Sequence, residues 1–311
     1  MDGETLPHFA YALAHDQRRF EESLLAFFSA RIRNANTRES YLRALKPFFR
    51  RMSLYNLHIE TMSSALIGAY IETLTFSIPS VRQHFAAIKS LFSHLHLEGV
   101  LSHNPTAAVK GPRFSQTEGK TPAFEEAEIQ LLLNSIETDT LVGLRDRALL
   151  STLFYSFSRV SAVTSLKLRD SVRLPSRSLL RFGEKGGLQH EIPCHRKLEA
   201  YLLAYLALAQ LPGKDCPIFQ PVRGKSQSLL GGEMSRFDVY RMVRRRTSRV
   251  GLPPHYGCHS FRATGITLFL ENGGIIENAQ KIAGHASPLT TKLYDRRLQK
   301  NLMTEINRLD I

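Results

Sequence analysis

One stretch of this chain, residues 99–122, is poorly suited to either helix or strand. Its turn-forming and helix-breaking residues are Gly99, Asn104, Pro105, Gly111, Pro112, Gly119 and Pro122. Such residues disfavour the interiors of regular elements, and Lys110, Arg113 and Lys120 add positive charge to the stretch. Because 311 residues exceed the usual size of one domain, the stretch predicts a basic linker between two domains.

The other boundaries follow from where periodic apolar residues begin and end. We expect an N-terminal extension at 1–19, a helical domain at 20–98, a second domain at 123–297 and a tail at 298–311. Within the helical domain, apolar side chains recur at helical spacing, which predicts four short amphipathic helices in a small bundle. Asn36 or Thr37 is expected to cap the second helix.

Basic side chains would lie on the outward faces of these four helices. They are Arg38, Arg43, Lys46, Arg50, Arg51, Arg82 and Lys89. Such residues can bind the phosphates of a nucleic acid, or they can simply be solvated, as charges on a helix exterior often are.

Residues 123–297 contain both helical and strand-like patterns. Short strands are expected at 165–168, 179–182 and 189–193, and the last two flank a glycine-rich hairpin turn at 183–187. Helices are expected at about 124–136, 143–157, 196–209, 236–250, 259–272, 275–283, 289–294 and 298–309. The predicted fold class is therefore mainly α with a small β-sheet.

The chain has an excess of positive charge, with a net charge of +13 that is unevenly distributed. Residues 1–112 carry a net charge of +3 and residues 113–311 a net charge of +10. A strongly basic chain usually binds a polyanion, of which nucleic acid is the commonest. The same charge could also serve only to keep the surface soluble.

The sequence gives no indication of a membrane or secreted protein. It lacks a run of eighteen apolar residues, and its acidic start, Met1–Glu4, is unlike a signal peptide. The three cysteines, Cys194, Cys216 and Cys258, have no close paired spacing. This pattern favours a reducing cytoplasm over a disulfide framework.

The C-terminal part contains a motif with chemical meaning. His259 and Arg262 are three positions apart on one face of an expected helix, so one phosphate could contact both. His285 follows a glycine between two expected helices, and Tyr294 lies nine positions further on. With Arg159 upstream, two guanidiniums could bind a phosphate while a tyrosine hydroxyl, activated by cationic neighbours, attacks it.

Each of these residues also has an ordinary structural interpretation. Tyr294 could be a packing residue, His259 a helix cap and His285 a buried core histidine. Arg159 and Arg262 could form structural ion pairs. The combination of order and spacing favours the chemical interpretation.

At these positions, and at Lys185 in the glycine-rich turn, the sequence resembles the tyrosine recombinase (phage integrase) superfamily. The resemblance extends from Phe20 to the C-terminus. It implies an N-terminal four-helix core-binding (SAM-like) domain and a C-terminal mixed α/β tyrosine-recombinase catalytic domain. It also implies that the basic linker crosses the DNA backbone, so that the two domains close like a clamp.

The resemblance implies a site-specific recombinase that cleaves and rejoins DNA. The implied catalytic residues are Arg159, Lys185, His259, Arg262, His285 and Tyr294. Tyr294 would be the nucleophile that forms a 3′-phosphotyrosine bond, and Lys185, on a mobile β-hairpin, would protonate the leaving 5′ oxygen. Because the phosphotyrosine keeps the energy of the broken linkage, a second 5′-hydroxyl can rejoin the strand. No metal, cofactor or ATP is expected, since the arginines and histidines supply the electrostatic stabilisation.

Three positions depart from the usual family pattern. Ala162 stands where many members carry an acidic residue, Ser158 stands where Leu or Met is frequent, and Ala263 stands where histidine is frequent. These departures indicate a divergent branch. They leave open an inactive, sequence-specific DNA-binding protein. DNA relaxation of the type IB topoisomerase kind is a further alternative.

The family resemblance also implies partners. We expect double-stranded DNA with inverted-repeat half-sites, bound by a homodimer on one site and a homotetramer in the synapse, and no membrane. The candidate DNA-binding residues are Arg38, Arg43, Lys46, Arg82, Lys89, Lys110, Arg244 and Arg245. The tail at 298–311 either docks on a neighbouring protomer or packs on its own domain. The expected location is the cytoplasm of a bacterial or phage-infected cell, in association with the nucleoid.

The twelve histidines do not form an obvious metal motif. His94 and His96 would point to different faces of a helix. His255 and His259 are four apart, but Pro253, Pro254 and Gly257 make a continuous helix there unfavourable. No metal site is therefore expected.

Overall fold

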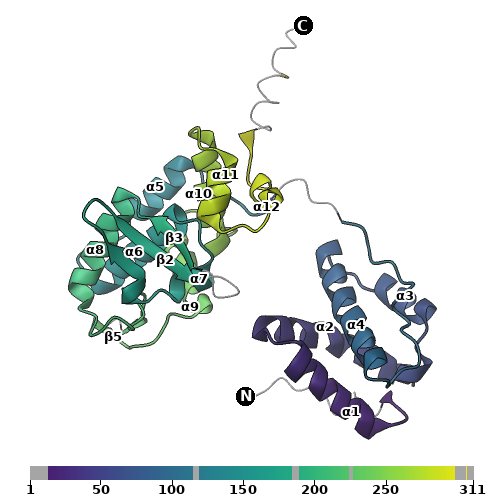
Figure 1. Ribbon diagram of the computed structural model, residues 1–311. Helices are drawn as coiled ribbons and strands as arrows, with labels where there is room; N and C mark the ends of the chain where they lie inside the picture. The colour runs from purple at the N-terminus through teal and green to yellow at the C-terminus, as the bar shows by residue number, and fades with distance from the viewer. Residues whose placement is uncertain (1–12, 115–118, 184–188, 224–226, 298–305, 307–311) are drawn as a thin grey trace. The chain divides into compact units, whose positions relative to one another are not determined.

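The computed structural model describes residues 13–114, 119–183, 189–223, 227–297 and 306. The chain divides into two compact units, Met1–Ser115 and Gln116–Ile311 (Figure 1). Among the described residues, no helix is both long enough and apolar enough to cross a membrane.

The first unit is entirely helical in its described part. Its elements are α1 (Gln17–Ala26), the π-helical turn η2 (Phe27–Arg31), α2 (Ala35–Leu54), the 3-10 turn η3 (Ile59–Thr61), α3 (Ser64–Glu72) and α4 (Ile78–Leu97). Asn34, not Asn36 or Thr37, caps α2, because its side chain accepts a hydrogen bond from the backbone N–H of Thr37. The helix therefore begins slightly earlier than predicted.

Aromatic side chains form the centre of this unit. The Phe48 ring lies edge-on to the rings of Tyr70, at 5.0 Å, and Phe92, at 6.0 Å. Phe20 and Phe27 are fully buried in the same core. Because large aromatic rings bury much apolar area, a few of them suffice to hold short helices together.

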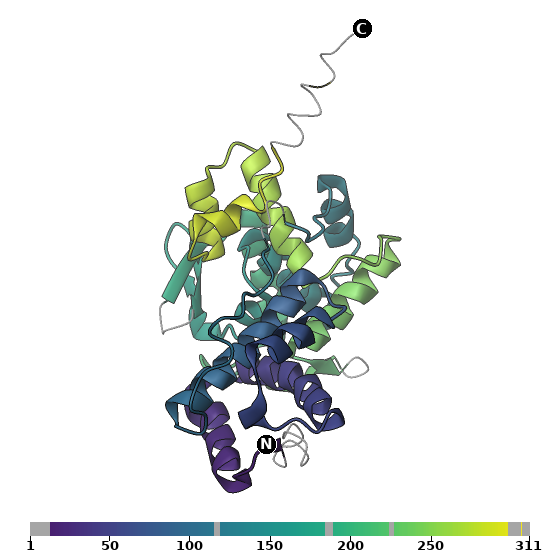
Figure 2. The same cartoon turned by 90° about the vertical axis from the view of Figure 1, so that its right-hand side faces the viewer.

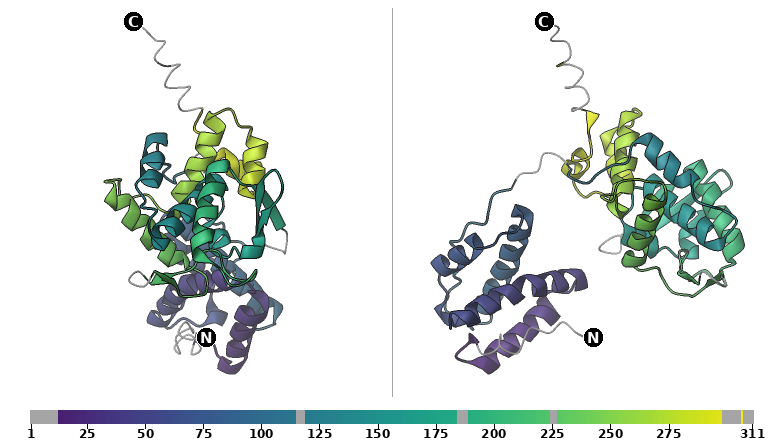
Figure 3. Two further views of the ribbon diagram at one scale, coloured as in Figure 1. Left: turned by 90° about the vertical axis from the view of Figure 1, so that its left-hand side faces the viewer. Right: turned by 180° about the vertical axis from the view of Figure 1, so that it is seen from behind.

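The second unit combines helices with two small sheets (Figures 1 and 3). Its helices are α5 (Glu126–Asn134), α6 (Leu141–Tyr155), α7 (Val160–Thr164), the 3-10 turn η4 (Leu168–Asp170), α8 (Arg196–Ala209), α9 (Arg236–Arg249), α10 (Cys258–Glu271), α11 (Ile276–Ala283) and α12 (Pro288–Lys292). Its strands are β1 (Ser171–Arg173), β2 (Ser178–Gly183), β3 (Gln189–Pro193), β4 (Val222–Arg223) and β5 (Ser228–Leu229). The first three strands form an antiparallel sheet in sequence order, and β4 pairs with β5.

Helix α6 lies at the centre of the second unit. It is buried along most of its length, and α8 and α10 both pack against it. Figure 2 shows α10, α11 and α12 side by side, coloured from green to yellow. This arrangement brings the C-terminal segments next to the end of α6.

The predicted strand at 165–168 is not a strand in the structure. Ser165 ends α7, and Leu168 begins η4. Between them, Lys167 forms a single bridge with Pro217. The alternation of Leu166 and Leu168 resembles a strand in sequence, but a helix end and a turn bury Leu166 equally well.

Candidate active site

Arg159 lies in a turn between α6 and α7, directly before Val160. In this turn Phe157 has a φ of +53°, in the left-handed region that non-glycine residues seldom adopt. The buried ring of Phe157 packs with Ile266 and Leu270 of α10, which supports the unusual backbone. The side chain of Arg159 is exposed, so the turn presents its guanidinium at the surface.

Helix α10 approaches this turn closely because residue 265 is a glycine. A Cβ atom at Gly265 would collide with the carbonyl oxygen of Phe154 and with the ring of Phe157. Because protein interiors are closely packed, such a collision would force the helix or the turn to shift. Gly265 therefore sets the distance between α10 and the turn that carries Arg159.

Arg262 connects the Arg159 turn with the end of α11. It is only 2% exposed. Its Nη1 donates to the carbonyl of Phe157, and its Nη2 donates to the carbonyl of Ala283 at 2.9 Å. Because a guanidinium is planar and rigid, these two bonds fix its orientation.

His285 follows the left-handed residue Gly284, which ends α11. The imidazole is buried, and its Nδ1 is hydrogen-bonded to the hydroxyl of Thr291 at 2.9 Å. Burial, together with the charges of Arg262 and Arg159, lowers the pKa of His285 to about 4. His285 is thus neutral at neutral pH.

His259 lies in the first turn of α10, three residues before Arg262. Its side chain is exposed at the surface. The neighbouring protein atoms nevertheless withdraw the ring partly from water and lower its pKa, and Arg262 and Arg159 add to this effect. The two arginines therefore act electrostatically on both histidines, which places all four groups in one local field.

Tyr294 lies just after α12, and its ring stacks on that of His285 at 5.9 Å with an angle of 12° between the planes. Its backbone is held at both ends, because its N–H donates to the Thr291 carbonyl at 3.0 Å and its carbonyl accepts from the Thr267 hydroxyl at 3.1 Å. The structure thus brings Tyr294 next to His285, in the same unit as both arginines.

Lys185 lies outside the described residues. The strands that flank it are described, with Gly183 paired to Gln189 at the last position of the β2–β3 register. His190 on β3 forms a hydrogen bond of 3.1 Å through Nε2 with the carbonyl of Ile282 on α11. The base of the hairpin is therefore attached to the helix that precedes His285.

The predicted DNA-binding residues of the first unit differ in their contacts. Arg38 donates to a main-chain carbonyl at 3.2 Å, and Arg82 donates to another at 3.3 Å. Arg43 forms an exposed ion pair of 2.6 Å with Glu39. Four further candidates lie at exposed or half-buried positions. They are Lys46, Lys89 and Lys110, and Arg244 on α9 of the second unit.

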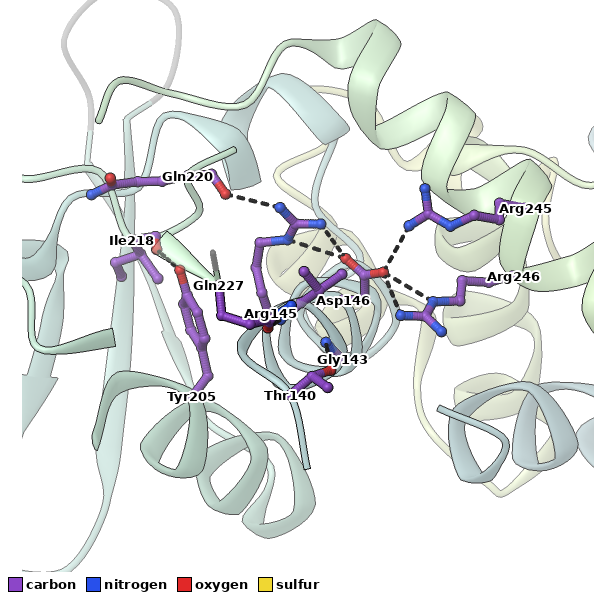
Figure 4. Close-up of polar contacts among 11 residues, drawn as sticks. Thr140, Gly143, Arg145, Asp146, Tyr205, Ile218, Gln220, Gln227, Arg245 and Arg246 are labelled. Carbon is purple, nitrogen blue, oxygen red and sulfur yellow. Dashed lines mark hydrogen bonds and ion pairs between the residues drawn. The ribbon is translucent and has the colours of Figure 1, made fainter. Parts of the chain in front are cut away.

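The remaining candidate, Arg245, belongs to a buried ionic network that the sequence analysis did not anticipate (Figure 4). Asp146 on α6 is fully buried and accepts hydrogen bonds from Arg145, at 2.6 Å, from Arg246, at 2.9 Å, and from Arg245, at 3.1 Å. Arg145 also donates to the carbonyl of Gln220 at 3.1 Å. The network joins α6 to α9, so Arg245 contributes to the packing of this unit.

The second unit therefore presents two guanidiniums, two neutral imidazoles and a tyrosine in one place. Guanidiniums match the geometry and charge of a phosphate, and a tyrosine hydroxyl is a competent nucleophile. A mainly helical unit with this set of groups defines a class of enzyme: tyrosine-type strand transferases, which break and rejoin DNA.

Within that class, the chain belongs to the phage integrase family, whose model matches residues 122–301. It is 26% identical over 270 residues to tyrosine recombinase XerD of Listeria monocytogenes serotype 4b (strain F2365), covering 84% of this chain and 88% of that protein. It is 30% identical over 237 residues to tyrosine recombinase XerC of Pelobacter propionicus, covering 76% of this chain and 75% of that protein. The resemblance described above is thus confirmed, and the chain is a site-specific DNA recombinase.

Solved structures confirm the expected fold class. The XerH site-specific recombinase bound to a palindromic difH substrate superimposes with a TM-score of 0.73, at 18% identity, over 97% of this chain and 93% of that one. A lambda integrase dimer bound to a COC′ core site gives a TM-score of 0.66, at 16% identity, over 89% and 76%. Both share the mainly α architecture with small sheets.

Proposed function

We propose that Tyr294 is the nucleophile of strand cleavage. Its hydroxyl oxygen forms a bond to the phosphorus of the scissile phosphodiester, and the bond from phosphorus to the 5′ oxygen breaks. The observation that carries this assignment is the stack of Tyr294 on His285, whose turn is hydrogen-bonded to Arg262 through Ala283. No other tyrosine of the described residues is stacked on a histidine that both arginines influence.

Arg159 and Arg262 would bind the non-bridging oxygens of that phosphate and stabilise the negative charge that develops on them. His259 and His285, neutral because their pKa values are lowered, can each donate a hydrogen bond to an oxygen or accept the phenolic proton. An imidazole with a low pKa is a weak base, so arginine charge supplies most of the driving force for deprotonation of Tyr294.

Lys185 would donate a proton to the departing 5′ oxygen, which leaves as a hydroxyl. In the reverse direction, the 5′-hydroxyl of another strand attacks the phosphotyrosine, returns its proton to Lys185 and releases Tyr294. The number and type of bonds are unchanged over the full cycle, so no external energy source is required. The flanking hairpin strands, anchored to α11 by His190, support this assignment.

We further propose that residues 20–98 act as the core-binding domain, 99–122 as the linker, 123–297 as the catalytic domain and 298–311 as an exchanged tail. The enzyme would bind inverted half-sites as a homodimer and form a homotetramer at the synapse, in the cytoplasm and on nucleoid DNA. Structures of lambda integrase as a dimer on a core site and as a tetramer on a Holliday junction share this fold, which supports the proposal.

The nucleophile can be tested with a duplex enriched from random DNA by binding to the protein and nicked beside the site, so that cleavage traps the strand. A denaturing gel should show a covalent adduct for the wild type and none for Tyr294→Phe, with DNA affinity unchanged. Tyr201→Phe, which removes the hydroxyl of a half-buried tyrosine in the same unit, should still form the adduct. An adduct with Tyr294→Phe would refute the assignment.

The same experiment addresses the alternative of an inactive DNA-binding protein, which Ala162 keeps open. Under that alternative, the wild type binds the enriched duplex but never forms an adduct. The intact arrangement of Arg262, His285 and Tyr294 favours an active enzyme.

A further inference from the structure

Two histidines and a glutamate come together in the first unit. The proposed catalytic residues all belong to the second unit. One ligand atom from each of His15, His58 and Glu60 lies within 4.8 Å of the other two. His15 precedes α1, whereas His58 and Glu60 flank the start of η3. The fold therefore brings together donors from two segments that are 45 residues apart in sequence.

The three side chains contact one another, but the ring planes of the two histidines are nearly parallel, so one ring must rotate before both can bind the same ion. The backbone N–H of His15 donates to Oε1 of Glu60 at 3.0 Å, which orients the carboxylate. The other oxygen, Oε2, lies 3.2 Å from Nδ1 of His15. The rings of His15 and His58 stack at 4.4 Å with 16° between their planes.

Two of these donor atoms lack a hydrogen bond. Nδ1 of His58 and Oε2 of Glu60 are both shielded from solvent and have no hydrogen-bond partner among the residues that the structure describes, apart from the ion-pair contact of 3.2 Å between Oε2 and Nδ1 of His15. A buried polar atom without a partner costs about 1–3 kcal/mol, so such atoms usually indicate a bound water or ion. Two of them within one cluster of three ligating side chains favour a shared ligand.

We propose that His15, His58 and Glu60 bind a divalent transition-metal ion of the Zn²⁺ type. Metal–nitrogen and metal–oxygen bonds of about 2.0–2.2 Å place neighbouring ligands of a tetrahedral ion about 3.3–3.6 Å apart. The separation of 3.2 Å between His15 Nδ1 and Glu60 Oε2 is close to the lower end of this range. Two imidazoles and one carboxylate favour zinc over magnesium or calcium, which prefer oxygen ligands.

The His15 side chain is 66% exposed, so one side of the site faces solvent and a water molecule can complete the tetrahedron. The ion would fasten the segment before α1 to the turn between α2 and α3. Metal binding to folded ligands stabilises the fold that presents them, and it requires neutral imidazoles. Zinc would therefore stabilise the first unit without taking part in strand cleavage.

The proposal is tested with the full-length protein, freed of metal by chelation and then titrated with Zn²⁺ and with Co²⁺. We expect one zinc ion per chain by elemental analysis after dialysis, and the visible absorption of tetrahedral Co²⁺ with nitrogen and oxygen ligands. His15→Ala, His58→Ala and Glu60→Gln should each weaken zinc binding at least tenfold. His103→Ala, at an exposed histidine of the same unit, should not.

Cys194 and Cys258 should compete only weakly for zinc, because burial raises the pKa of both thiols to about 11. A second measurement uses stability. Zinc should raise the Tm of the wild type by roughly 5 °C or more at saturating concentration and leave Glu60→Gln unchanged. Absence of stoichiometric zinc, or equal zinc binding by the wild type and all three variants, would overturn the proposal.

Discussion

Arg262 donates a hydrogen bond of 2.9 Å to the main-chain carbonyl of Ala283, two residues before His285. Its other terminal nitrogen donates to the carbonyl of Phe157, two residues before Arg159. One buried guanidinium therefore positions the turns that carry two further residues of the candidate site. This arrangement gives Arg262 a structural role in addition to its proposed contact with phosphate.

Arg262→Lys should impair both roles. A lysine ammonium is a single point and cannot bridge two carbonyls on opposite sides, although it preserves the charge. We expect the cleavage rate on the trapping duplex to fall at least 100-fold, and the free energy of unfolding to decrease by about 2 kcal/mol. Single-turnover gels and urea titrations measure the two effects. Arg249→Lys, at an exposed position of α9, is the control, and equal behaviour of the two variants would contradict this role.

Gly265→Ala should destabilise the second unit. The added methyl group would collide with the Phe154 carbonyl and the Phe157 ring, so α10 or the Arg159 turn must shift. Overpacking of this kind typically costs about 1–3 kcal/mol. The matched control is Gly68→Ala in α3, where a Cβ meets nothing within 4 Å and alanine should stabilise the helix by up to about 1 kcal/mol. Opposite signs for the two variants in urea titration are the expected result.

Asp146→Asn should reveal the importance of the buried network. The substitution keeps the shape of the side chain but removes the charge that three arginines share. Removal of one partner from a buried ion pair costs about 3–5 kcal/mol, and here the charges of Arg145 and Arg246 would stay buried. The control is Asp215→Asn, which breaks an ion pair with Arg169. The side chain of Asp215 is 73% exposed and that of Arg169 is 55% exposed, so the free energy of unfolding should change by less than about 0.5 kcal/mol. Denaturant midpoints compare the two, and similar losses would argue against the network.

The stability of the enzyme should depend on pH through His285. Its pKa is about 4 in the folded state, against 6.5 for an ordinary histidine. Between these values the unfolded chain binds more protons, so this contribution to stability is complete above pH 6.5 and is lost as the pH falls toward 4. The difference between the two pKa values corresponds to a contribution of at most about 3 kcal/mol to the free energy of unfolding. His285→Gln should show a shallower decline in the free energy of unfolding over this window, and an identical decline would contradict the assignment.

Helix periodicity and the order of the motif residues were sufficient to predict much of this molecule. The helices of both units follow from apolar spacing, and the family identification that predicted a site-specific recombinase is confirmed by the comparisons. The grouping of Arg262, His285 and Tyr294 was anticipated from their order and spacing together with the family resemblance. Their catalytic roles remain predictions.

Other features could not be predicted because they depend on contacts distant in sequence. Arg245 is a surface cation as expected, with its side chain 47% exposed, but its additional hydrogen bond to a buried carboxylate on α6 could not be predicted. The pairing of His15 with His58 was also missed, since the histidine spacings that were considered are local and these two come together only in the folded chain. The strand expected at 165–168 failed for a related reason, because its burial pattern is satisfied by a helix end.

Helix α10 carries His259, Arg262, Gly265 and the hydroxyl of Thr267 that holds the carbonyl of Tyr294. A movement of this helix along its axis would therefore displace these groups together and leave their mutual spacing intact. Their alignment with Arg159 would change, because α10 meets the Arg159 turn at Phe157, through the bond from Arg262 to its carbonyl and the packing of Gly265, Ile266 and Leu270 on its ring. The recombinase thus has a candidate active centre built from two pieces, and the surface where α10 packs on Phe157 is where the two arginines are brought into register.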